Sequence, residues 1–324
     1  MNRTFGRAAA LSSAVQIGFV LGALGFALHG TADRFDPRRV FAASALVGAL
    51  TSAALLVTPV GGVAQVVLRA VTGAALAGVY PVGMKIVVGW SVERRGLLIG
   101  LLVGALTLGS ASPHLIAVFG GADWRATVVV ASLLAALAAV LALGASLGPH
   151  HARAPRLDAG ALGLAWRRRP IRLAYAGYLG HMWELYAFWA WIGAAALAAF
   201  TEALGDGAAP AARLVTFAAI ALGGVACVPA GWLADRIGKA WVAQAAMVLS
   251  ASAAVATALS FGGPVWLTAG LIVLWGIAVI PDSAQFSALV ADAAPPARAG
   301  SLLTFQTALG FLLTAVVVQA VPMV

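Results

Sequence analysis

The feature that most constrains this chain is a series of about ten long apolar runs that fill most of its 324 residues. A helix needs about 20 mostly apolar residues to cross the core of a bilayer, and each run is long enough. Short segments with glycine, proline or charge separate the runs. They cover residues 9–30, 40–59, 63–89, 96–119, 125–147, 171–200, 212–234, 240–261, 264–288 and 299–321. The sequence therefore predicts an all-α, polytopic membrane helix bundle.

Composition excludes the main alternatives. Apolar residues make up 62% of the chain and charged residues only 10%, whereas soluble domains carry about 25% charged residues. A transmembrane β-barrel would show strict alternation of apolar and polar residues, and the runs do not. The net charge of +9 comes from basic loops and not from a basic face, so it favours membrane lipids over nucleic acid as partners. The single cysteine, Cys227, permits no disulfide framework.

Basic residues predict the orientation of the chain. Of the 20 Lys and Arg residues, fifteen lie in alternate loops or at the helix ends beside them. Cytoplasmic loops are enriched in Lys and Arg, so we expect these loops to be cytoplasmic and both termini to lie outside. On this basis the protein would be a multi-pass protein of the plasma (inner) membrane.

Two loop segments resemble each other and divide the chain. Ala32-Asp33-Arg34 and Ala234-Asp235-Arg236 are 202 residues and six spans apart, which indicates a parallel repeat. The long loop between the halves reads as a solvated, lipid-facing linker. We therefore predict an N-terminal bundle at 1–148, a cytoplasmic linker at 149–170 and a C-terminal bundle at 171–324.

These loops also carry a resemblance to a known family. Gly231–Lys239, with the sequence Gly-Trp-Leu-Ala-Asp-Arg-Ile-Gly-Lys, resembles the loop signature of the major facilitator superfamily, and the first copy resembles it more weakly. Arg69 with Gly73 is similar to the intramembrane arginine motif of that family.

The resemblance implies two bundles that rock about a central site. It also implies that the loops latch neighbouring helices through gating residues, namely Asp33, Arg34, Asp235, Arg236 and Lys239. Against the twelve-helix plan of the family, the chain corresponds to the middle ten helices. A truncated gene, a misplaced start or a genuine ten-helix variant would each give this sequence.

Ionisable residues inside the membrane are candidate functional residues because charge is costly there. His181 and Glu184 are three residues apart on one predicted helix and share a face, with Tyr178 one turn earlier. We interpret them as a substrate and proton-coupling site, although a purely structural pairing with each other or with Arg69 is the alternative. Arg69 suits an anionic partner, or its long side chain extends to the outer surface. Asp282, which follows Pro281, suits a substrate site, a gate or a helix contact equally.

The predicted function is secondary active transport of a small solute by alternating access, coupled to protons, as a symporter or antiporter. Arg69 favours an anionic solute, whereas the aromatic residues around Glu184 suit an organic cation equally. The alternatives are a membrane enzyme using His181, Glu184 and Asp282, and a truncated, non-transporting relative. The sequence has no phosphate loop, nucleophile elbow or zinc-protease motif, so we expect no catalytic activity, cofactor or metal. We also expect the protein to be a monomer.

Overall fold

The computed structural model describes residues 2–91, 93–120, 123–151, 158 and 160–321. Nearly all of these residues are helical, and no strand is found among them. The helices are α1 (Asn2–His29), α2 (Thr31–Arg34), α3 (Pro37–Ala54), α4 (Val63–Leu76), α5 (Tyr80–Val88), α6 (Arg95–Gly120), α7 (Trp124–Gly144), α8 (Ala161–Arg167), α9 (Arg169–Leu204), α10 (Ala208–Ile237), α11 (Lys239–Leu259), α12 (Val265–Val279), α13 (Ser283–Ala293) and α14 (Pro296–Ala320).

The apolar helices match the predicted spans. Within the described residues, nine helical stretches are long and apolar enough to cross a membrane. One of them, Arg169–Ile237, contains both α9 and α10, joined by a 3-10 turn at Gly205–Gly207. That stretch holds two of the ten predicted spans. The prediction of an all-α, multi-pass bundle is confirmed.

Two predicted spans are broken helices, which the apolar pattern did not reveal. The span at 63–89 is interrupted at residues 77–79, between α4 and α5, and the span at 264–288 at residues 280–282, between α12 and α13. A Val-x-Pro sequence overlaps each break, at residues 79–81 and 279–281. Proline cannot donate the helical hydrogen bond to the residue four positions earlier. The 200-residue offset is close to that of the two loop motifs, so the breaks fall at matching places in the repeat.

Contacts divide the chain into two compact units. Unit 1 comprises Met1–Val92, Arg125–Trp183 and Leu289–Val324, and unit 2 comprises Glu93–Trp124 and Glu184–Ala288. Each unit draws on segments from both halves of the sequence, and α9 continues from one into the other. This grouping by contact does not test the boundaries at residues 148 and 171, which stay a prediction.

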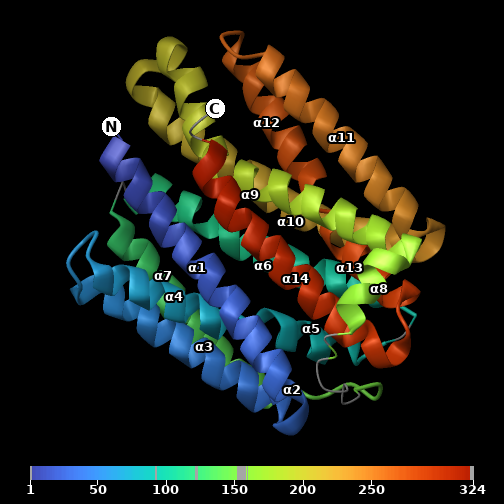
Figure 1. Ribbon diagram of the computed structural model, residues 1–324. Coiled ribbons are helices and arrows are strands. Elements are labelled where there is room, and N and C mark those ends of the chain that lie inside the picture. Colours follow the sequence, from blue (N-terminus) through green and yellow to red (C-terminus); the bar gives the residue numbers. More distant parts are fainter. Residues whose placement is uncertain (1, 92, 121–122, 152–157, 159, 322–324) are drawn as a thin grey trace. The chain divides into compact units, whose positions relative to one another are not determined.

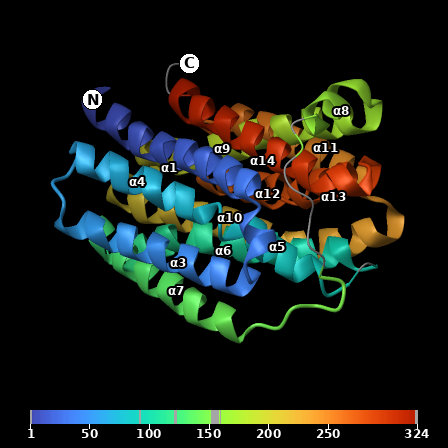
Figure 2. The same ribbon diagram turned by 60° about the horizontal axis from the view of Figure 1, so that its bottom comes forward.

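Glycines bring helix backbones together in unit 1, where α1 and α4 run side by side (Figure 1 and Figure 2). A Cβ atom on Gly18 would lie 2.0 Å from the carbonyl oxygen of Ala70, and one on Gly73 would lie 1.9 Å from that of Val15. Only glycine permits such an approach. Small residues at helix interfaces are typical of membrane proteins. Burial of apolar surface does not drive helices together there, because the surrounding lipid tails are equally apolar.

The same device joins α6 and α10 in unit 2. Gly96, Gly100 and Gly104 recur every fourth residue on α6, and a Cβ atom at any of them would lie within 2.6 Å of an atom of α10 or its Asp235 side chain. The two helices therefore pack backbone against backbone. This close pairing fixes the position of Asp235 at the end of α10 relative to the first turn of α6.

Part of the predicted linker is a short helix that packs against α14. Residues 161–167 form α8, and its Ala161 and Ala165 are buried against Leu302 of α14. Before α8, the carboxylate of Asp158 forms an ion pair with the guanidinium of Arg298 at 2.7 Å. The backbone N–H of Asp158 donates a hydrogen bond to the Ser301 hydroxyl at 2.8 Å. In this part of the predicted solvated, lipid-facing linker, Ala161 and Ala165 of α8 are buried, whereas Leu162 and Trp166 are exposed.

Candidate functional site

Glu184 lies near the middle of α9 and joins three helices of unit 2. Its Oε1 atom accepts hydrogen bonds from the Ser250 hydroxyl of α11 and from Nε1 of Trp275 in α12, the latter at 2.7 Å. The indole of Trp275 also packs edge-on against Phe188, with ring centroids 4.9 Å apart. A rise of 1.5 Å per residue places Glu184 about 23 Å from the start of α9 and about 30 Å from its end.

The donors to Glu184 are neutral, and they reach only one oxygen. The described residues give the carboxylate no cationic partner and leave Oε2 without a hydrogen bond. Hydrogen bonds to a charged acceptor are about twice as strong as neutral ones, so these two bonds would be stronger with an ionised Glu184 than with a neutral one. Arg69 belongs to the other unit, so the alternative of a pairing between Glu184 and Arg69 stays untested.

His181 and Tyr178 lie on the part of α9 that belongs to unit 1. The His181 side chain is buried, and its ring centroid lies 6.3 Å from that of Tyr178. Tyr178 packs over Gly310 of α14, where a Cβ atom would lie only 2.6 Å from Cε1 of the tyrosine ring. Tyr178 is therefore packed against α14, with the buried ring of His181 beside it. Glu184 belongs to the other unit, so their predicted shared site stays a prediction.

Arg69 is half-buried in α4, at the close contact with α1. The described residues provide no carboxylate or hydrogen-bond partner for its guanidinium. A cation inside a membrane is costly unless it is paired or reaches water. The geometry is therefore compatible with an anionic partner, and the role predicted for Arg69 stays a prediction.

Asp282 occupies the helix break between α12 and α13. It immediately precedes the first residue of α13, the position at which aspartate favours the start of a helix, and it is only 3% exposed. Its backbone carbonyl accepts hydrogen bonds from the N–H groups of Gln285 and Phe286 at 3.0 and 3.2 Å. Asp282 therefore marks the point where the membrane-spanning segment changes from one helix to the next.

Asp235 caps the start of another helix. Its two carboxylate oxygens accept hydrogen bonds from the backbone N–H groups of Gly96 and Leu97, each at 3.0 Å. These groups belong to the first turn of α6, where amides lack helical partners and the helix dipole favours a negative charge. The contact joins residues that are 139 positions apart in the sequence. Asp235 thus holds the end of α10 to the start of α6.

The other gating candidates have different surroundings. The guanidinium of Arg236 lies over the indole of its neighbour Trp232, 3.7 Å from the ring centroid. Lys239 begins α11, and Arg34 ends the four-residue helix α2 as an exposed side chain. The side chain of Asp33 lies outside the described residues. No gating role is tested by these positions, so all of these roles stay predictions.

Sequence reasoning missed several residues that hold these sites. Ser250 lies in a charge-free apolar run and Trp275 in a run whose one charged residue is Asp282, and nothing in their spacing points to Glu184. Asp36 begins α3, and it pairs with Arg38 at 2.7 Å. Arg38 also donates to the carbonyl of Ala145, just after α7, at 3.3 Å. A signal existed only for this pair, because aspartate before proline is typical of a helix start. Among the described residues, no group of three or more potential ligands could hold a metal ion.

Comparison with known proteins identifies the family. The model of the Major Facilitator Superfamily matches residues 1–318. The chain belongs to the major facilitator superfamily. It is therefore a multi-pass membrane protein of a transporter family, which points to transport of a small solute and not to catalysis.

A solved structure supports the fold of this superfamily member. The chain is similar to the crystal structure of a mutant of the nucleoside transporter NupG, with a TM-score of 0.69 and 16% sequence identity. The match covers 98% of this chain and 83% of that one. No protein in the curated collection searched matches the sequence.

Proposed function

We propose that this chain is a proton-coupled transporter of a small solute and that Glu184 is the group that gains and loses the proton. The observation that carries the proposal is the contact set of its carboxylate. Oε1 binds two neutral donors from two neighbouring helices, and no cation among the described residues neutralises the charge. An ionisable residue at this depth in a membrane protein is a functional candidate by default.

Protonation of Glu184 would change how three helices hold together. The charged carboxylate binds the Ser250 hydroxyl and the Trp275 indole strongly, whereas a neutral carboxyl group accepts more weakly. Oε2, which has no partner among the described residues, is the atom at which a proton or a solute donor group adds. The proton would thereby loosen α9 from α11 and α12, which supplies a physical link between proton binding and helix movement.

Alternating access would also require a contact that breaks and reforms at the membrane surface. We assign that role to Asp235, whose hydrogen bonds hold the first turn of α6. The excess of Lys and Arg in the loops on this side supports a cytoplasmic position for the latch. In that orientation, release of Asp235 would accompany the change between outward-facing and inward-facing states.

The experiment is a proton-flux screen in proteoliposomes that contain the purified protein and an internal pH-sensitive dye. Nucleosides, sugars, amino acids, small carboxylates and organic cations are added outside one at a time, without a label. We expect at least one class to change the internal pH with the wild-type protein and not with protein-free liposomes. Glu184→Gln keeps a hydrogen-bond acceptor for Trp275 but cannot be protonated, so it should abolish the pH change.

A matched control is Glu202→Gln, which removes an exposed carboxylate elsewhere on the same helix, near the end of α9. It should behave as wild type. Proton flux that is unchanged in Glu184→Gln would remove Glu184 from the proposed role. If a radiolabelled solute accumulates in the same proteoliposomes and the internal pH does not change, the coupling itself is refuted, while membership of the transporter family stands.

A further inference from the structure

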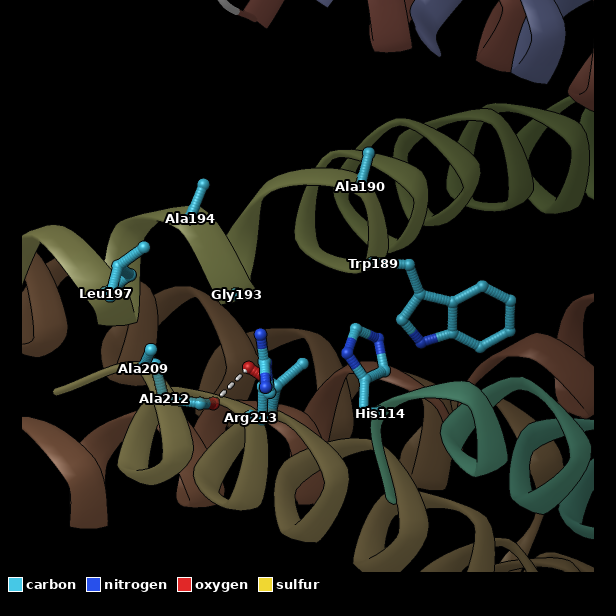
Figure 3. Close-up of a pocket in the computed structure, with 10 residues that line it drawn as sticks. His114, Trp189, Ala190, Gly193, Ala194, Leu197, Ala209, Ala212 and Arg213 are labelled. Carbon is cyan, nitrogen blue, oxygen red and sulfur yellow. Dashed lines mark hydrogen bonds between the residues drawn. The ribbon is translucent and has the colours of Figure 1, made fainter. Parts of the chain in front are cut away.

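A second site lies in unit 2, away from the Glu184 contacts. Residues of α6, α9 and α10 surround a cavity of about 330 Å³ (Figure 3). Its polar lining residues are His114, Trp189, Arg213 and Thr216, and alanine, glycine and leucine side chains complete the walls. None of the four polar residues belongs to the site predicted for proton coupling.

The position of the cavity along the helices places it near the opposite membrane face from Asp235. Arg213 and Asp235 are 22 residues apart on α10, which corresponds to about 33 Å. This distance is close to the thickness of a bilayer core, about 30 Å. Gly193 lies nine residues beyond Glu184 on α9, so the cavity and Glu184 are at different depths in the same unit.

Two of the polar side chains that line the cavity, Trp189 and His114, have no hydrogen-bond partner among the described residues. Nε1 of Trp189 is buried, and no described residue provides it with a hydrogen-bond partner. The described residues also give the imidazole of His114 no partner. In Figure 3 this imidazole is seen between the labelled side chains of Arg213 and Trp189. A buried donor without an acceptor costs free energy, so such a group indicates a site for a ligand that accepts hydrogen bonds.

Arg213 makes one structural hydrogen bond, which uses only a small part of the donors of its guanidinium. One Nη1 N–H donates to the carbonyl of Ala117 at 3.0 Å, in the last turn of α6, where carbonyls lack helical partners. A guanidinium has five N–H donors, and the described residues provide no further hydrogen bond or carboxylate for the others. The contact with Ala117 therefore fixes the guanidinium at the cavity and leaves donors for a ligand.

The absence of acidic lining residues decides the charge of the ligand. The lining contains one permanent cation and the imidazole and indole donors, but no aspartate or glutamate. A guanidinium binds carboxylate and phosphate groups through paired hydrogen bonds. The cavity volume of about 330 Å³ is near the lower end of the range for ligand pockets, about 300–1,000 Å³. Its size and charge thus fit a small anion with two acceptor oxygens.

We propose that this cavity binds the carboxylate of a small organic anion, with Arg213, Trp189 and His114 as the residues that contact it. The guanidinium of Arg213 binds the charge, the indole N–H of Trp189 donates to one oxygen, and the apolar wall receives the remainder of the solute. Binding of the anion at equilibrium needs no proton gradient. This site can therefore be tested separately from proton coupling through Glu184.

The test measures binding to the full chain in nanodiscs of phosphatidylcholine. Radiolabelled benzoate is the probe in equilibrium dialysis, and acetate, inorganic phosphate and the neutral isostere benzamide are the competitors. We expect benzoate to bind, acetate to compete and benzamide not to compete. Arg213→Gln should weaken benzoate binding by about tenfold or more, the change expected when a charge-assisted hydrogen bond is lost. Trp189→Phe, which removes only the N–H, should weaken it less.

Gly193 offers a matched pair that leaves every charge in place. A Cβ atom here would lie 3.4 Å from Oγ1 of Thr216 and 4.0 Å from Cε1 of His114, which is ordinary van der Waals contact. Gly193→Ala should therefore fold and bind benzoate, whereas Gly193→Leu should fill the cavity and abolish binding. Arg125→Gln, which removes a cation from α7 in unit 1, should bind as wild type.

Several results would overturn the proposal. These are no benzoate binding by the wild-type protein, equal competition by benzamide, or unchanged binding in both Arg213→Gln and Gly193→Leu. Displacement of benzoate when phosphatidylglycerol is added to the nanodisc would assign the cavity to a lipid headgroup instead. Because no step requires a proton gradient, benzoate binding can fail while proton flux through Glu184 persists, and the reverse also holds.

Discussion

Glu184 and Asp235 are two carboxylates of unit 2 that accept two hydrogen bonds each and have different surroundings. Asp235 uses both oxygens to bind backbone N–H groups of Gly96 and Leu97. Glu184 uses a single oxygen to bind the side chains of Ser250 and Trp275. Backbone amides at a helix start need an acceptor, which is Asp235 in this state and water when the contact is released, whereas side-chain donors can turn to other partners.

The surroundings of a carboxylate determine which role it can have. Asp235 complements the positive end of the α6 dipole, so its charge is stabilised at a fixed place. Glu184 has no dipole or cation of this kind among the described contacts, and its second oxygen has no partner there. We therefore expect Asp235 to act through stability and conformation, and Glu184 to act through proton exchange.

The largest effect should come from Glu184→Gln. With a solute identified by the proton-flux screen, uptake driven by a pH gradient should fall by more than tenfold, because the variant cannot carry a proton. Exchange of labelled for unlabelled solute at equal pH should persist, because it needs no net proton movement. If gradient-driven uptake and exchange fall together, the proton-carrying role is contradicted, since Glu184 would then act as a general packing or binding residue.

Asp235→Ala should produce the next largest effect, and on stability. Loss of a capping side chain costs about 0.5–2 kcal/mol, so the melting temperature of the purified protein should fall. Asp235→Asn keeps an acceptor for one amide, so its melting temperature should fall less than that of Asp235→Ala. Cysteine-accessibility labelling should also show a changed balance between inward-facing and outward-facing states. A wild-type balance in both variants would indicate an ordinary turn and not a latch.

Removal of the donors to Glu184 singly should have smaller effects. Ser250→Ala and Trp275→Phe each leave the other donor in place, and a single hydrogen bond contributes about 1 kcal/mol net. Gradient-driven uptake should fall by about two- to tenfold in each variant. The double variant should approach Glu184→Gln. Equal uptake in all three variants and the wild type would show that these hydrogen bonds do not tune the carboxylate.

A third carboxylate provides the smallest expected effect. Hydrogen bonds from the Arg38 side chain lower the pKa of Asp36 to about 2, below the ordinary value of about 3.9. Its contribution to stability is therefore present above about pH 4 and is lost as the pH falls through about 2. Because the pair is exposed, this contribution is small.

Arg38→Gln should remove most of this pH dependence, which a series of melting temperatures between pH 5 and pH 2 would detect. Arg39→Gln is the control, because the neighbouring cation Arg39 has only a minor influence on the pKa of Asp36. An identical pH profile in Arg38→Gln and the wild type would contradict the assignment.

The sequence predicted the helices more completely than the site. Apolar runs and basic loops sufficed for the spans, because lipid requires every spanning segment to satisfy its own backbone hydrogen bonds. In the sequence, the two breaks were marked only by Pro81 and Pro281 in apolar runs, and proline is also tolerated in unbroken membrane helices. Their matching positions in the repeat became evident only from the structure.

Site residues resisted prediction for a physical reason. Charges such as Glu184 and Asp235 stand out in an apolar sequence, but their partners do not. Ser250 and Trp275 contact Glu184 only because α9, α11 and α12 converge, and helix packing in membranes depends on small residues spread along many helices. His114 and Arg213 are 99 residues apart and line one cavity, which no spacing rule anticipates.

The most direct test of the account is infrared difference spectroscopy of the purified protein between acidic and alkaline pH. If Glu184 exchanges the proton, the wild-type spectrum should contain a carboxylic acid band that is sensitive to hydrogen bonding. This band should be absent from Glu184→Gln, unchanged in Asp235→Asn and shifted in Ser250→Ala. The same band at full intensity in Glu184→Gln would contradict the central claim.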